Sequence, residues 1–92
     1  MTIAKDSSSL PDGRSLLTLP RLKEARVLSV TDHRAGDVIA RRLRELGFVP
    51  GELVRVVAQG PLGGDPLLVQ VGFTRFALRR AEAERVQVEP LP

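Results

Sequence analysis

The sequence predicts a mainly β domain, a small barrel of about five short strands with one short α-helix. Three observations predict this fold class. The chain has 92 residues, which suits one domain with a compact core. Only one segment repeats its apolar residues at helical spacing, and after it they recur with a period of two, which indicates strands. A strongly bent sheet that closes on itself would also protect the edges of such short strands.

The first 14 residues are expected to form a disordered N-terminal tail. Asp6–Ser9 and Pro11–Gly13 are polar or turn-forming. Such a stretch buries too little apolar area to offset the entropy that it loses on ordering. The folded domain is therefore expected to span residues 15–92.

A strand and a helix are predicted at the start of the domain. Ala25–Thr31 is rich in β-branched residues and predicts the first strand. The helix is predicted by apolar residues at helical spacing, namely Ala35, Ile39, Leu43 and Leu46. Asp37 falls in its first turn, where the helix dipole favours a negative charge. Arg41 follows four residues later, a spacing that allows modest mutual support.

A glycine predicts where this helix ends. Gly47 follows the last apolar residue of the helical pattern, so a left-handed backbone is expected there. Phe48 is expected to fold back on the last turn and to stay partly exposed. Pro50 presets φ and Gly51 supplies a positive φ for a type II turn. This turn leads into a strand at Leu53–Val57.

The remaining strands are short and are separated by glycine and proline. Gly60–Pro66 forms a loop between two of them, and Gly72–Arg75 suggests a tight hairpin between the next two. The alternating residues that define the strands are Val54 and Val56, then Leu67, Val69 and Val71, then Phe76 and Leu78, and finally Val86 and Val88.

The composition excludes several kinds of enzyme chemistry. The chain has no cysteine and one histidine, which excludes disulfides, zinc–thiolate sites and thiol nucleophiles. It also has no glycine-rich phosphate loop. His33 stands beside Asp32 in a polar stretch, where an exposed loop histidine is expected rather than a metal site. We therefore predict no catalysis, no cofactor and no metal ligand.

Nucleic acids and membranes are not expected as direct partners. The chain has three phenylalanines and no tryptophan or tyrosine, and its arginines are interleaved with acidic residues. It therefore lacks the stacking platforms of a nucleic-acid interface and the aromatic groove that binds proline-rich peptides. No apolar run approaches the ~20 residues of a membrane span. A cytoplasmic protein is expected, one that meets the inner face of a membrane only through a partner.

Three motifs carry a family resemblance. They are the helix end Leu43–Gly51, the loop Pro61–Pro66, and Phe76–Ala83 leading into Arg85–Val88. In type, order and separation they resemble the ferrous iron transport protein A (FeoA) family over Ser15–Glu89. The loop departs from the family pattern, because Gly63-Gly64 stands where one glycine is usual, and the N-terminal tail has no counterpart.

The resemblance implies an SH3-like β-barrel and a small accessory or regulatory protein of bacterial ferrous iron uptake. The implied partner is the cytoplasmic part of the membrane transporter FeoB. Two other classes stay open. One is a stand-alone regulatory module, similar to the SH3-like domain at the C-terminal end of metal-dependent transcription regulators. The other is a self-associating structural protein that pairs its edge strands into a homo-oligomer.

The residues expected to bind a partner are Arg41, Arg44 and Glu45 on the helix, Phe48 at its end and Leu62 in the glycine loop. The helix carries an excess of arginine and would suit an acidic partner. Leu62 is framed by glycine and proline, which would present its side chain to solvent. A solvated helix surface and a plain connecting loop are the alternative interpretations.

Overall fold

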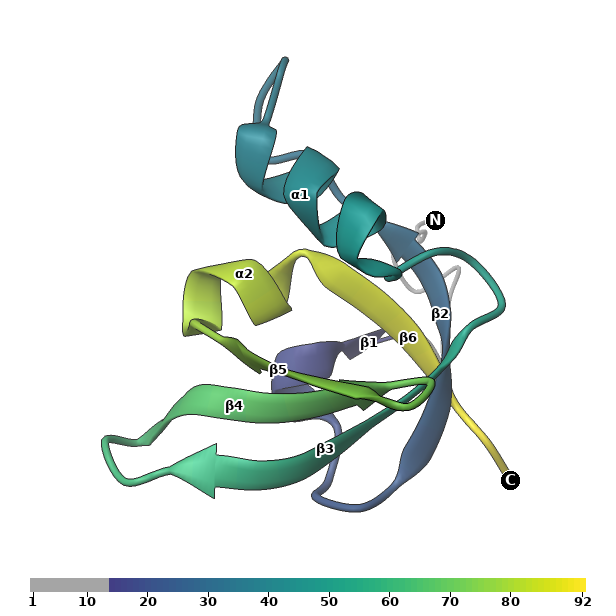
Figure 1. Cartoon of the computed structure of the whole chain (residues 1–92), viewed down its shortest axis with the longest axis vertical. Coiled ribbons are helices and arrows are strands. Elements are labelled where there is room, and N and C mark those ends of the chain that lie inside the picture. Colours follow the sequence, from purple (N-terminus) through teal and green to yellow (C-terminus); the bar gives the residue numbers. More distant parts are fainter. Residues whose placement is uncertain (1–13) are drawn as a thin grey trace, which may run out of the picture.

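A computed structural model describes residues 14–92 of the chain, and Figure 1 shows how they are arranged. The described residues form six strands, two short α-helices and one 3-10 helix. In chain order these are β1 (Arg14–Ser15), η2 (Leu16–Thr18), β2 (Glu24–Val30), α1 (Val38–Leu46), β3 (Leu53–Gly60), β4 (Gly64–Val71), β5 (Thr74–Leu78), α2 (Arg80–Glu84) and β6 (Val86–Pro90).

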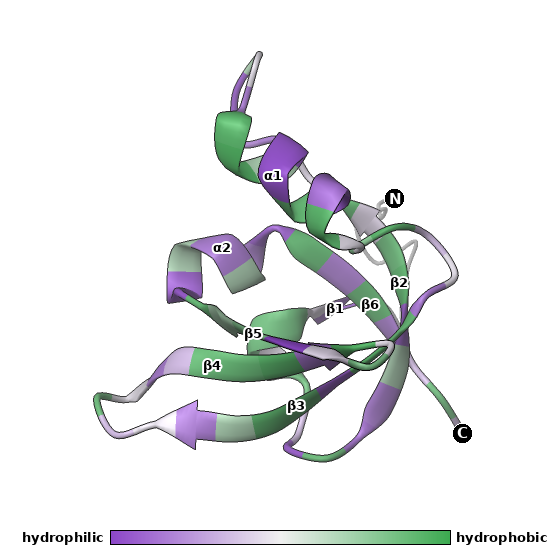
Figure 2. Cartoon of the chain, viewed as in Figure 1, coloured by the Kyte–Doolittle hydropathy of each residue, from purple (hydrophilic) through white to green (hydrophobic). Residues whose placement is uncertain are grey.

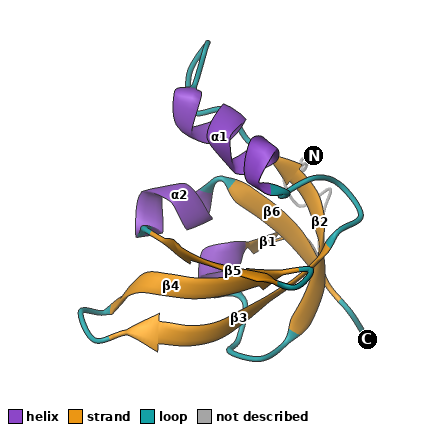
Figure 3. Cartoon of the chain, viewed as in Figure 1, coloured by secondary structure: helices purple, strands orange, loops and turns teal. Residues whose placement is uncertain are grey.

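The six strands form one antiparallel sheet in the order β1-β6-β2-β3-β4-β5. The sheet is strongly bent, so its strands wrap around a common interior (Figure 3). The predicted mainly β fold class is therefore confirmed. β1 and β5 are the two ends of the sheet and do not pair with each other in the described structure, so β5 keeps one free edge.

The structure adds two short elements to those predicted. β1 has two residues and α2 has five, too few to show an alternation or a helical period in the sequence. In the first turn of α2, the Glu82 carboxylate accepts a hydrogen bond from the backbone N–H of Arg79 at 2.8 Å. This contact satisfies one of the N–H groups left free at the start of a helix.

The core is built from alternate strand residues and one side of α1. Figure 2 shows hydrophobic residues along β4 and hydrophilic ones on the outer side of α1. Among the described residues, the buried hydrophobic side chains are Leu16, Leu19, Ala25, Val27, Val30, Ala40, Leu43, Phe48, Val54, Val56, Leu67, Val69, Val71, Leu78, Ala83, Val86 and Val88. Burying each of the larger ones contributes roughly 1.5–3 kcal/mol of transfer free energy.

The predicted corner between α1 and β3 is confirmed. Gly47 is left-handed, with φ at 118°. The next N–H, that of Phe48, donates to the carbonyl of Leu43 at 3.1 Å, which closes the last turn of the helix. Gly51 has a φ of 93°, as a type II turn requires at its third residue. The chain therefore reverses into β3 where the sequence indicated.

The predicted tail lies almost wholly outside the described residues. Residues 1–13 fall outside the described part, whereas Arg14 lies in β1 and pairs with Val88 of β6. Leu16 follows and is fully buried, so the described domain is anchored in the core from its start. Within residues 14–92, neither α-helix has the length and hydrophobicity to cross a membrane.

Candidate functional site

The five residues predicted to bind a partner do not form one surface. Arg41, Arg44 and Glu45 are exposed on α1, whereas Phe48 is buried. Leu62 is 80% exposed in the loop between β3 and β4. In Figure 1 this loop lies at the far end of the β3–β4 hairpin, away from α1. The fold thus groups the three helix residues and leaves the loop leucine apart from them.

The predicted partial exposure of Phe48 is wrong, because its side chain is 0% exposed. The left-handed Gly47 turns the chain inward, so the ring enters the core below α1 instead of lying on the helix surface. There it packs against Phe76, with ring centroids 6.0 Å apart and planes inclined by 51°. Tilted pairs of this kind are favourable for aromatic rings. Phe48 is a core residue and cannot contact a partner directly.

Arg44 tethers the helix to the sheet. Its Nη2 donates to the carbonyl oxygen of Val30 at 2.7 Å and to the carboxylate of Asp32. Both acceptors lie at or just beyond the end of β2, so the guanidinium fixes the last turn of α1 against that strand. Arg41 has no such engagement with the described residues and is the freer of the two arginines.

Asp37 and Arg85 form a buried ion pair that no local pattern in the sequence indicates. Arg85 Nε donates to Asp37 Oδ2 at 2.8 Å, and the two side chains are 7% and 1% exposed. The same carboxylate caps α1 by accepting from the N–H groups of Ile39 and Ala40, and it also accepts from that of His33 at 2.9 Å. The His33 hydrogen bond, followed by that of Arg85, holds the pKa of Asp37 far below its usual range.

The expected support between Asp37 and Arg41 is replaced by the pair with Arg85. Asp37 is the N-cap of α1 and precedes its first turn, so its side chain points back over the helix end instead of along the surface. The side chain of His33 is on an exposed loop, as expected. Among residues 14–92, no three His, Cys, Asp or Glu side chains are grouped so that they could hold a metal ion together.

A groove of about 230 Å³ lies between α1 and the free edge strand β5. Its lining residues are Ile39, Arg42, Leu43 and Leu46 of α1, Arg75–Leu78 of β5, and Glu82 of α2. Four hydrophobic residues of the described chain pack on the core while staying partly exposed, and Ile39, Leu46 and Phe76 are three of them. The groove is therefore one place where the apolar core reaches solvent.

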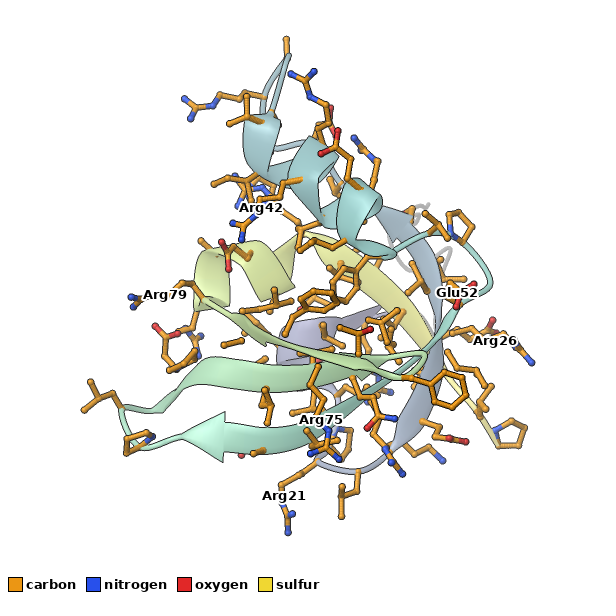
Figure 4. The ribbon with its side chains drawn as sticks, in the orientation of Figure 1. Arg21, Arg26, Arg42, Glu52, Arg75 and Arg79 are labelled. Atoms are coloured by element: carbon orange, nitrogen blue, oxygen red, sulfur yellow. The ribbon has the colours of Figure 1, made fainter. Side chains whose placement is uncertain are left out.

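The rim of the groove is basic. Arg42 Nη1 of α1 lies 3.7 Å from Glu82 Oε2 of α2, and the two side chains are 69% and 19% exposed. Figure 4 shows Arg42 on the side of α1 that faces α2, with Arg79 where β5 passes into α2. Arg75 of β5 is also exposed and lines the groove, although its Nε donates to Gln70 Oε1 of β4 at 3.3 Å. Because exposed pairs contribute only about 0–1 kcal/mol, an incoming charge can replace the contact between Arg42 and Glu82 at little cost.

The size of the groove favours a protein ligand over a small molecule. Small-molecule sites usually measure roughly 300–1,000 Å³ and enclose their ligand. This groove is smaller, and one of its walls is the free edge of a sheet. Its dimensions suit a few side chains of a partner segment.

The bent six-stranded sheet and the groove beside its edge together define a small, mainly β domain. The chain belongs to the FeoA family, since the model of the FeoA domain matches residues 14–90. No match was found among curated protein sequences.

Solved structures agree with this assignment. The FeoA of Stenotrophomonas maltophilia, complexed with zinc, is 67% identical over 82% of this chain and 88% of its own, with a TM-score of 0.76. That protein is described as an SH3 domain protein and a candidate bacterial ferrous iron transport activating factor. The FeoA protein of Chlorobium tepidum is 36% identical over 85% of this chain and 70% of its own, with a TM-score of 0.73. The SH3-like fold and the FeoA resemblance are confirmed.

The fold also occurs within a larger regulator. A manganese-dependent transcriptional repressor in complex with manganese is 21% identical, with a TM-score of 0.74. The match covers 88% of this chain and 38% of the repressor. At this identity the likeness shows a shared fold alone.

Proposed function

We propose that this protein is a cytoplasmic accessory protein of ferrous iron uptake, and that it acts by binding the cytoplasmic part of the transporter FeoB. The observation that carries the proposal is its membership of the FeoA family across residues 14–90. It is supported by the description of a 67% identical FeoA as a candidate ferrous iron transport activating factor. In this proposal the chain has no catalytic role.

We further propose that the groove between α1 and β5 is the main contact surface. Binding energy concentrates where apolar anchors are desolvated, and neighbouring charges set specificity and the rate of association. The groove combines partly exposed apolar side chains with Arg42 at its rim. Arg41 and Glu45 provide charge, and Leu62 provides apolar surface, but neither location combines the two. We therefore assign these residues to the periphery of the contact.

Co-purification with FeoB tests the proposal. We expect the wild-type chain to co-purify with the transporter, and Arg42→Glu to weaken this association strongly without unfolding the domain. Arg41→Glu, on the outer side of the same helix, is the matched control for added negative charge. Leu62→Asp tests the loop, and we expect a small effect. Uptake of ferrous iron should also fall in cells that lack the protein.

Normal uptake in those cells, together with no association, would remove the adaptor proposal. The second candidate, a stand-alone regulatory module, would then lead. It is favoured by one observation, the fold shared with a metal-dependent repressor. Self-association through the free edge of β5 is the third alternative, and sedimentation of the purified chain distinguishes it.

A further inference from the structure

We infer that the groove takes an extended peptide segment, which adds to the free edge of β5 as a further strand and alternates apolar with acidic residues. The inference rests on the proposed function for where the segment comes from. The chemistry of the ligand follows from the groove and the edge of β5 alone.

The backbone of β5 is free to pair on its groove side. β5 ends the sheet and pairs only with β4 in the described structure. A two-residue loop, Gly72-Phe73, joins these strands, so the first pair of the hairpin is hydrogen-bonded and the pattern alternates beyond it. By this alternation, the N–H and C=O groups of Arg75 and Ala77 point away from β4. They offer an incoming strand two sets of main-chain partners.

The opposite wall of the groove supplies apolar contacts. Ile39 and Leu46 of α1 face β5 across the groove and stay partly exposed. An edge strand opposite a helix with apolar side chains is the arrangement by which PDZ domains bind extended peptides. Main-chain hydrogen bonds hold the peptide along the strand, and every second side chain enters the apolar space.

The side chains of β5 set the pattern of the ligand. Phe76 is half-buried and Leu78 is buried on the inner face, whereas Arg75 and Ala77 are exposed on the outer face. Arg79 continues the outer row, because its backbone is still extended, with φ −71° and ψ 160°. A strand added beside β5 shares this alternation. Its inner residues meet apolar surface and its outer ones meet arginines, which favours acidic side chains there.

Charge argues against a second copy of the chain as the occupant. If two β5 strands paired edge to edge, the outer row of one copy, which holds Arg75 and Arg79, would lie beside the same row of the other. Like charges that face each other across strands are destabilising. A basic outer row also discourages edge-to-edge association in general. An acidic segment from a different protein would instead place negative charges beside these arginines, which is favourable.

Selection from a displayed library of random twelve-residue peptides on the full chain tests the inference. We expect the enriched peptides to alternate apolar residues with Asp or Glu. On binding, the amides of Arg75 and Ala77 should exchange more slowly with solvent, as newly paired amides do. No enrichment, or enriched peptides whose binding shifts the NMR signals around Leu62 instead, would overturn the inference.

Two matched pairs of variants test the binding mode with a selected peptide. Ala77→Pro removes one groove-facing N–H at an exposed edge position and should weaken binding about tenfold, whereas Ala77→Ser keeps the N–H and the affinity. Arg75→Glu should weaken binding about tenfold as well. Arg55→Glu is its control, since Arg55 of β3 lies on the same face of the sheet, two strands from the free edge and across Gln70 from Arg75. If Arg75→Glu and Arg55→Glu weaken peptide binding equally, the inference is overturned. This comparison holds even if Ala77→Pro fails to fold.

The outcomes separate this inference from the proposed function. The library needs no transporter, so enriched peptides without co-purification of FeoB would keep the ligand chemistry and remove the partner. Co-purification that survives both Ala77→Pro and Arg75→Glu would keep the partner and overturn strand addition. A dimer in sedimentation that Ala77→Pro abolishes would assign the edge to a second copy and also overturn the inference.

Discussion

Two ion pairs connect α1 and its N-cap with α2 and its C-cap, and they differ in burial. The pair of Asp37 with Arg85 measures 2.8 Å and is almost fully buried, and its carboxylate accepts three backbone hydrogen bonds as well. The pair of Arg42 with Glu82 measures 3.7 Å, and its arginine is 69% exposed. The same type of contact therefore occurs once in the interior and once at the surface.

The difference shows how the domain combines a fixed helix with an open groove. A buried charge that loses its partner is costly, so the inner pair fixes the start of α1 against the end of α2. An exposed pair contributes little, so the outer one leaves the rim of the groove free to exchange partners. We therefore propose that stability and binding depend on separate charges, the first at the ends of α1 and α2 and the second on the exposed sides of these helices.

The largest expected effect comes from the buried pair. Asp37→Asn keeps a side chain that can cap α1 but removes the negative charge, which leaves Arg85 buried without its counter-charge. We expect the melting temperature to fall by about 10 °C or more. Thermal unfolding followed by circular dichroism measures it. A change as small as that of a surface substitution would show that the inner pair does not fix the helix.

The other end of α1 gives the next largest effect. At Gly47 an added Cβ would meet only Val71 at 3.7 Å, an ordinary contact, so the cost of a substitution comes from its φ of 118°. Gly47→Val should cost about 1–3 kcal/mol of unfolding free energy, because a β-branched residue is strained at positive φ. Gly47→Asn should cost less. Chemical denaturation measures both, and equal costs would contradict a backbone origin.

Acid should remove the contribution of the buried pair. Since folding lowers the pKa of Asp37 below its usual value of 3.8, the stabilisation that its carboxylate contributes is fully present at neutral pH. It declines as the pH falls below 3.8, because the unfolded chain then binds the proton more readily. The difference in melting temperature between wild type and Asp37→Asn should therefore stay constant down to about pH 4 and narrow below it. A difference that grows in acid would have the wrong sign.

The exposed pair gives the smallest effect on stability. Glu82→Gln removes its negative charge, and we expect the unfolding free energy to change by less than about 0.5 kcal/mol. The same thermal or chemical unfolding experiment measures this. The substitution also removes the acidic group from the groove rim, so binding of an acidic segment should become stronger. A loss of stability comparable to that of Asp37→Asn would erase the distinction between the two pairs.

Local patterns predicted the strands and the corner after α1. Gly47 and Gly51 act through their own backbone angles, and β4 and β5 show their alternation within a few residues. Such features depend on neighbours in the chain, so the sequence displays them. The family resemblance added the SH3-like arrangement.

Contacts between distant segments could not be predicted in the same way. Asp37 and Arg85 are 48 residues apart, and nothing near either residue indicates the other. The expected partial exposure of Phe48 is wrong because a position at a helix end does not reveal which way the left-handed turn directs the ring. The groove combines α1, β5 and α2 and exists only after folding. Its one signal in the sequence is that Ile39 and Leu46 belong to the apolar stripe of a strongly basic helix.

We propose above all that the groove between α1 and β5 is the main contact surface for the transporter. The most direct measurement is NMR of the isotope-labelled chain during titration with the soluble cytoplasmic part of FeoB. We predict that the signals of Arg75–Leu78 and of Ile39, Arg42 and Leu46 change most, while those of Arg41, Glu45 and Leu62 change little. Changes centred on Leu62 or on the outer side of α1, with the groove signals unmoved, would contradict the account.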